Sequence, residues 1–307
     1  MTVAQARPLA TRLPWNDRAG RFSPVKATVL ALVCVPALWI AWQALVIGLG
    51  PRPLTEAIHK VGDWTVYLLL TTLAVTPARR LFEWSKLIQV RRIVGLAALS
   101  YILVHFTLYV VDSRLDLIFV GNEIIHRVYL ATGFTAILGL LALGVTSTDA
   151  MIKRLGAIRW NRLHKLIYFI VPLAILHYYM QSKVDVTQPV LMSGFFFWLM
   201  GYRLMARYGC KEGLVPLFLL AAGAALAAAL VEGAWYGIAT GIGAKRILLA
   251  NLDFGFSIRP AWWVLAAGIT VALAAEGRKR LAIARPAAKR PATARAIGRI
   301  DAHSESC

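Results

Sequence analysis

The sequence has little charge for its length. Only 16% of its 307 residues are charged while 59% are hydrophobic, and the mean hydropathy is +0.63. A soluble domain carries about 25% charged residues, so this composition excludes the ordinary soluble class. Apolar runs of about 20 residues recur along the chain, the length that crosses a hydrocarbon core of roughly 30 Å. The sequence therefore predicts an all-α polytopic membrane protein.

The motifs that attach or bind redox cofactors in many other proteins are missing. Cys34, Cys210 and Cys307 form neither a CxxC pair nor a CxxCH motif, so any haem would be held without covalent attachment. No GxGxxG segment in a βαβ setting is present, which argues against a built-in module for nicotinamide or flavin. No nucleophile or acid–base pair stands out, and we assign no catalytic residue.

Acidic residues are also scarce, with 15 against 34 basic ones and a net charge of +19. Such an excess can indicate nucleic acid, but here Lys and Arg concentrate in the tails and in alternate loops. That distribution is typical of membrane topology, so we expect the lipid bilayer and no nucleic acid as a partner. Basic loops follow every second span and the amino tail is basic. The positive-inside rule then places both termini in the cytoplasm of a bacterial inner (plasma) membrane protein.

Eight spans are predicted, over residues 27–47, 61–76, 93–111, 128–145, 160–181, 189–205, 214–235 and 260–276. They divide the chain into a basic cytoplasmic tail (1–26), a core transmembrane domain (27–210), additional transmembrane helices (211–276) and a basic disordered cytoplasmic tail (277–307). In the loop before the fifth span, Thr148 or Asp149 is expected to cap a short interfacial helix that ends at Gly156.

Two histidines stand inside apolar spans, where an imidazole is costly unless it has a partner. His105 in the third span and His177 in the fifth each lie thirteen residues from the cytoplasmic entry, or roughly 20 Å at 1.5 Å per residue. This shared depth favours one haem held between the two helices by two axial imidazoles. The alternative is that each histidine only hydrogen-bonds to a neighbouring helix.

A second group of candidates lies nearer the cytoplasm. His164 is thirteen residues before His177 and would face another side of an ideal helix. It is either a further cofactor contact or haem ligand at its own level, if the helix tilts or kinks near Pro172, or an ordinary interfacial side chain. Arg91 and Arg92 are topology determinants or neutralise a phosphate or propionate. The other histidines are expected to be solvated or uninformative: His59, His126 and His303.

Three stretches together resemble a known family. They are PLTEAIHKVGDWTVYLLLTTLAVTPARRL from Pro53, RRIVGLAALSYILVHFTLYVVD from Arg91, and TSTDAMIKRLGAIRWNRLHKLIYFIVPLAILHYYMQSKVD from Thr146. The ordered motifs RRxxGL…LH, TST and LHxLxY…H are similar to those of the haem-binding membrane subunits of periplasmic protein-methionine-sulfoxide reductase systems (MsrQ, also called YedZ). That family belongs to the ferric-reductase-like transmembrane group.

The resemblance implies a ferric-reductase-like helix bundle over residues 27–210 and a b-type haem on His105 and His177, with His164 matching a third intramembrane histidine. It also implies FMN and electron input from the quinone pool or a flavin reductase. The output partner would be a periplasmic molybdopterin-containing methionine-sulfoxide reductase catalytic subunit, which repairs oxidised proteins. The chain would then be the electron-transfer subunit of this oxidoreductase system.

Two departures and two rival functions accompany the resemblance. Where the family has RPY, this chain reads Arg127-Val128-Tyr129, and it adds two spans and a tail. The added region could be a packing extension, a partner dock or a quinone-site wall. One rival function is another ferric-reductase-like cytochrome. The other is a cofactor-free transporter or membrane assembly factor, which predicts no visible absorbance in the pure protein.

Overall fold

The computed structural model describes residues 13–17, 19–182, 185–255 and 257–284. Apart from an isolated bridge between Asn16 and Phe22, the regular structure in these ranges is helical, which confirms the predicted all-α class. The elements are α1 (Pro24–Trp42), η2 (Gln43–Ile47), α2 (Pro53–Leu81), η3 (Ser85–Gln89), α3 (Arg91–Asp112), α4 (Leu117–His126), α5 (Val128–Val145), α6 (Asp149–His164), α7 (Ile167–Ser182), α8 (Thr187–Arg207), α9 (Leu214–Thr240), α10 (Ala244–Ala250) and α11 (Pro260–Ala284).

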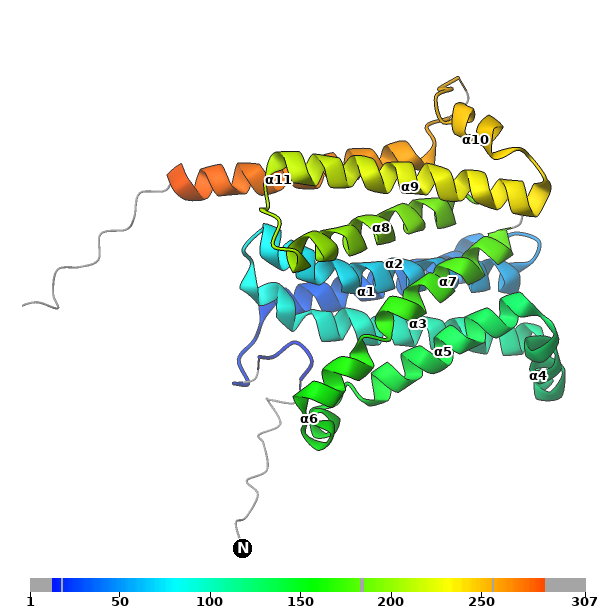
Figure 1. The fold of residues 1–307 in the computed structure, drawn as a ribbon. Helices are drawn as coiled ribbons and strands as arrows, with labels where there is room; N and C mark the ends of the chain where they lie inside the picture. Colours follow the sequence, from blue (N-terminus) through cyan, green and yellow to red (C-terminus); the bar gives the residue numbers. More distant parts are fainter. Residues whose placement is uncertain (1–12, 18, 183–184, 256, 285–307) are drawn as a thin grey trace, which may run out of the picture.

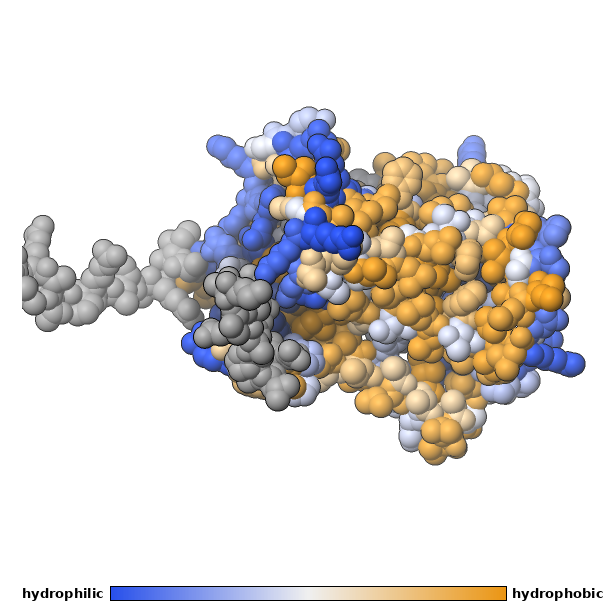
Figure 2. Space-filling view, turned by 90° about the horizontal axis from the view of Figure 1, so that it is seen from below, coloured by the Kyte–Doolittle hydropathy of each residue, from blue (hydrophilic) through white to orange (hydrophobic). Residues whose placement is uncertain are grey.

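The long helices run alongside one another as a single bundle (Figure 1). The closest packing is of α2 against α3, of α5 against α7, and of α9 against both α8 and α11. The start of α1 and the end of α11 lie at the same end of the bundle, while α4 lies at the opposite end (Figure 1). Figure 2 shows a broad apolar surface between hydrophilic ends, as expected for a membrane bundle.

Among the described residues, six helices are long and apolar enough to cross a membrane, and the bent pair α6–α7 makes a seventh. The remaining predicted span is the second, 61–76, which corresponds to α2 and is not among them. This helix is longer than predicted, is less apolar along its length, and has many buried residues because it packs against α1, α3, α7 and α8. The expected count of eight therefore exceeds the count of apolar spans by one, the central α2.

The predicted outer loop after α3 contains a helix that sequence reasoning missed. Asp116 caps α4, its carboxylate accepting the Phe119 N–H at 2.9 Å. Ile118 and Ile125 on one face of α4 are 80% and 76% exposed, whereas Val120 on another face is buried. An exposed apolar face beside a buried one is typical of a helix that rests in the membrane interface.

The fifth span begins later than predicted. The Thr148 side chain caps α6 by accepting the Met151 N–H at 3.2 Å, as expected, and Gly156 interrupts the helix with φ of 75°. The chain then resumes helical structure as far as His164, and a bend of 41° separates α6 from α7. The direction of the chain therefore changes just before Ile167, rather than at Pro172.

The carboxyl tail begins later than predicted too. Gly277–Ala284, expected to be disordered, continue α11 because Arg, Lys, Leu and Ala favour helix. The rest of that predicted tail, residues 285–307, lies outside the described residues, as do residues 1–12 of the amino tail.

A proline inside α1 is accommodated by a tyrosine of α3. Pro36 lacks an N–H and its ring disturbs the turn before it. The Tyr101 hydroxyl inserts there, donating to the Val33 carbonyl at 2.8 Å and accepting the Ala37 N–H at 2.9 Å. Because hydrocarbon offers backbone groups no water, this side chain both repairs α1 and fixes it to α3.

The added helices α9 and α11 are joined by small residues and by an ion pair whose carboxylate is buried. Glu232 is 2% exposed and accepts hydrogen bonds from Arg259 at 3.1 Å and from Asn251 at 3.2 Å. One turn further along α9, Trp235 contacts Tyr179 of α7, with ring centroids 4.8 Å apart. The extension therefore packs against the core domain at α7.

Gly268 lies where α11 packs tightly against α9, and we predict that Gly268→Ala destabilises the protein. A Cβ there would lie 2.5 Å from the Ala221 Cβ and 3.2 Å from its Cα, so backbone must move. Overpacking of this kind costs about 1–3 kcal/mol. Thermal unfolding of the detergent-solubilised protein measures it. Gly277→Ala on the same helix, where nothing lies within 4 Å, is the control. Equal melting temperatures for the two variants would contradict the prediction.

Candidate functional site

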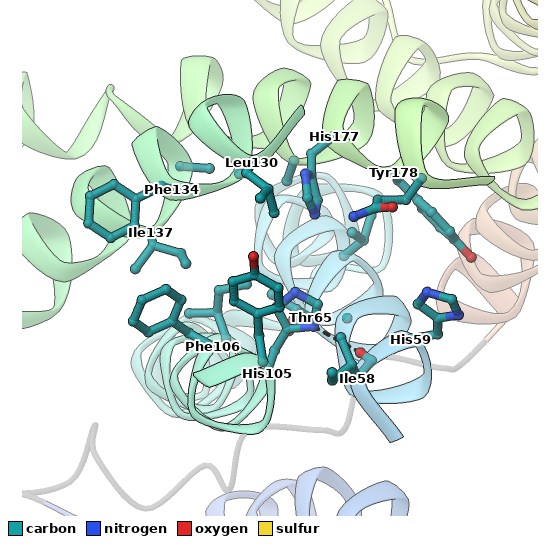
Figure 3. Close-up of a pocket in the computed structure, with 18 of the residues that line it drawn as sticks. Ile58, His59, Thr65, His105, Phe106, Leu130, Phe134, Ile137, His177 and Tyr178 are labelled. Atoms are coloured by element: carbon teal, nitrogen blue, oxygen red, sulfur yellow. Dashed lines mark hydrogen bonds between the residues drawn. The ribbon is translucent and has the colours of Figure 1, made fainter. Parts of the chain in front are cut away.

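His105 of α3 and His177 of α7 meet between their helices. Their ring centroids are 6.3 Å apart and their planes are nearly perpendicular, at 89°. Figure 3 shows the two side chains reaching toward each other from opposite sides of one pocket. The structure thus brings together the two histidines that sequence depth had placed at one level.

Each imidazole is anchored at Nδ1 by a backbone carbonyl of a neighbouring helix. His105 Nδ1 lies 2.8 Å from the Ile58 oxygen on α2, and His177 Nδ1 lies 2.7 Å from the Tyr129 oxygen on α5. A carbonyl can only accept, so both rings carry their proton on Nδ1. The Nε2 lone pairs are left for another ligand, and this arrangement is the usual one for a metal-binding histidine.

The pocket between the histidines encloses about 270 Å³. One side of it is apolar, with Phe106, Phe134 and Ile137 grouped together in Figure 3. The other side carries His59 and Tyr178 (Figure 3), with Asp63, Gln181 and Ser182 also in the lining. The pocket therefore suits a ligand with a large apolar body and a polar edge.

The spacing of the rings can be compared with what an iron between them requires. A metal–imidazole bond of about 2 Å, plus roughly 1 Å from the nitrogen to the ring centre, places two axial rings about 6 Å apart. The observed separation is 6.3 Å. Together with the free Nε2 atoms and the apolar lining, this spacing fits the bis-imidazole haem predicted from the sequence. The described residues hold no group of three or more His, Cys, Asp or Glu that would indicate another kind of metal centre.

His164 stands apart from this pocket, at the end of α6. Its ring stacks on Trp160 with centroids 3.7 Å apart, and its Nε2 is 3.4 Å from the Ser147 hydroxyl. Arg91 lies close enough for the two charges to interact, whereas Arg92 pairs with Asp149 at 2.9 Å on the exposed surface. These three sequence candidates therefore belong to the other end of the helices and do not line the histidine pocket.

Sequence reasoning missed the polar rim of the pocket. His59 was expected in a solvated loop, but it lies on α2 and lines the pocket while its side chain remains exposed. Asp63, one turn further along, is hydrogen-bonded to the Tyr178 hydroxyl. An acid inside a predicted span was the available signal, because a carboxylate in hydrocarbon needs a partner. His126 is exposed at the end of α4, as expected, with its Nδ1 2.8 Å from the Asn122 carbonyl oxygen.

Comparison with known proteins supports the resemblance seen in the sequence. Residues 61–175, a range that includes His105 and ends two residues before His177, match the family described as ferric reductase like transmembrane component. A relative from Caulobacter vibrioides, named protein-methionine-sulfoxide reductase heme-binding subunit MsrQ, is 37% identical over 175 residues, covering 56% of this chain and 83% of that protein. The chain belongs to the MsrQ family.

Other MsrQ relatives give the same picture. Those from Xanthomonas campestris pv. campestris and Rhodospirillum rubrum are 40% and 36% identical over 194 and 191 residues, which is 61% and 62% of this chain and 88% and 89% of theirs. No solved structure matches the chain. Family membership and the apolar helices together identify a multi-pass inner membrane protein.

Proposed function

We propose that this chain binds one b-type haem between His105 and His177 and acts as the electron-transfer subunit of a methionine-sulfoxide reductase. The observation that carries the proposal is the pair of imidazoles, 6.3 Å apart, each with its proton fixed on Nδ1 by a carbonyl. The MsrQ relatives are named as haem-binding subunits of such a reductase, which supports the same reading.

Different pocket residues would contact different parts of the haem. His105 and His177 would bind the iron, and the apolar side with Phe106 and Phe134 would exclude water from the ring. The polar rim would receive the propionates, with Gln181 as a hydrogen-bond donor. Bound haem would supply one-electron chemistry, while the protein sets its place and surroundings.

The direction of transfer follows from the position of the site. The histidine pocket lies toward the α4 end of the bundle, opposite the end where the described chain begins and finishes. With both termini in the cytoplasm, as the basic loops predict, this would be the periplasmic end, and an electron would leave toward a periplasmic molybdopterin-containing catalytic subunit. The donor, a quinone or flavin reductase, would act at the inner end. There Arg91, Arg92 and His164 offer cationic and aromatic groups to a quinone or to FMN.

The ligand assignment is tested by the reduced-minus-oxidised visible spectrum of the purified protein. We predict a b-type signal that is lost in both His105→Ala and His177→Ala, because a single remaining imidazole cannot hold the iron on both sides. His126→Ala, on an exposed histidine outside the pocket, is the control and should keep the full signal. If the intact, folded protein shows no visible absorbance, the cofactor-free transporter or assembly factor becomes the better reading.

The perpendicular rings predict a distinctive magnetic signature. The two imidazole planes are 89° apart. If both rings bound one iron in this orientation, the two iron dπ orbitals that overlap with the ring π systems would be nearly equal in energy. We therefore expect the ferric protein to give a highly anisotropic low-spin EPR signal rather than the rhombic signal of parallel rings. A rhombic signal would show that the rings rotate when the iron is bound, despite their hydrogen bonds to the Ile58 and Tyr129 carbonyls.

The partner is tested by reoxidation of the reduced protein in a stopped-flow experiment. A periplasmic methionine-sulfoxide reductase catalytic subunit, supplied with methionine sulfoxide, should reoxidise the reduced protein on the time scale of catalytic turnover. A ferric chelate alone should not. Fast reoxidation by the chelate and none by the catalytic subunit would instead indicate another ferric-reductase-like cytochrome.

A further inference from the structure

Two glycines occupy equivalent places beside the two histidines. The carbonyl that accepts the hydrogen bond from His105 Nδ1 belongs to Ile58, and Gly62 follows four residues later on α2. The carbonyl that accepts the hydrogen bond from His177 Nδ1 belongs to Tyr129, and Gly133 follows four residues later on α5. The same carbonyl-and-glycine spacing thus recurs on two unrelated helices, once for each imidazole.

The geometry of an α-helix explains why this spacing matters. Every Cα–Cβ bond tilts toward the helix amino terminus, so the Cβ of residue i+4 leans over the turn that contains the carbonyl of residue i. That carbonyl already accepts the N–H of residue i+4 and must be approached from the side to accept a second donor. A Cβ at i+4 can crowd that side, and glycine leaves it open.

The distances show that both glycines face the hydrogen-bonding edge of the ring. A Cβ on Gly133 would lie 2.8 Å from His177 Nδ1 and 2.9 Å from its Cε1, closer than real contacts allow. A Cβ on Gly62 would lie 3.1 Å from both Nδ1 and Cε1 of His105, which is tight but less severe. In each case the atom met first is on the edge that donates to the carbonyl.

We propose that Gly62 and Gly133 are positioning residues, which open the Ile58 and Tyr129 carbonyls so that each histidine is held with its Nε2 toward the pocket. This inference rests on the proposed function, since it concerns the haem ligands. The hydrogen bond at Nδ1 fixes the tautomer and makes the imidazole a stronger donor to iron. A stronger donor favours the ferric state, so the two glycines also keep the midpoint potential low.

The test substitutes each glycine in the full chain and measures haem content, midpoint potential and the ferric EPR signal. Gly133→Ala should shift the potential upward and alter the EPR anisotropy, or lose haem altogether. Gly62→Ala should do the same to a smaller extent, because its contact is longer and the ring can give way. Alanine is the better helix former, so such losses cannot come from weaker helix propensity.

Gly139→Ala is the matched control on the same helix. Its Cβ would lie 2.9 Å from the Ile170 side chain, a crowding similar to that at Gly133 but against a residue that does not line the pocket. It should leave the potential and the EPR signal unchanged even if the protein becomes less stable. If Gly133→Ala and Gly62→Ala match this control in both readouts, the positioning role is overturned while haem binding stands. An unaltered protein that binds no haem would overturn the proposed function and this inference together.

Discussion

A proton on a buried imidazole nitrogen needs an acceptor, and in the hydrocarbon core only the protein can supply one. Helix carbonyls are the acceptors at hand, but each already receives its own i+4 N–H. His105 and His177 solve this by sharing the Ile58 and Tyr129 carbonyls. Their ring orientation, and with it the pocket between α3 and α7, depends on that sharing.

The same constraint organises other parts of the bundle. Where Pro36 disturbs α1, the Tyr101 hydroxyl takes up both the carbonyl and the N–H left over, and this contact sets α1 against α3. Where α9 buries Glu232, Arg259 and Asn251 close round the carboxylate. In each case a polar group that would be costly alone in hydrocarbon is hydrogen-bonded by residues of other segments. These hydrogen bonds fix how the helices pack against one another.

Sequence reasoning reached the histidine pair because depth along a span needs only topology and a rise of 1.5 Å per residue. It reproduced α5 over its full length, since Val128–Val145 is apolar throughout and bounded by polar residues. It missed α4, whose ten residues are too few for a span and read as a loop, and it missed the rim formed by His59 and Asp63. The second error has a separate cause: which side of a helix meets the pocket depends on neighbours far away in the chain.

The helices beyond residue 213 can be judged by what they touch. The histidine pocket is lined from α2, α3, α4, α5 and α7, and none of its lining residues comes from α9 to α11. The extension instead contacts α7 through Tyr179, on which Trp235 packs. Ser193 of α8 donates a hydrogen bond to the Tyr179 hydroxyl at 3.2 Å. Tyr179 is two residues after His177 and points to the other side of α7. The described part of the extension therefore supports the helix that carries His177 and forms no wall of the pocket.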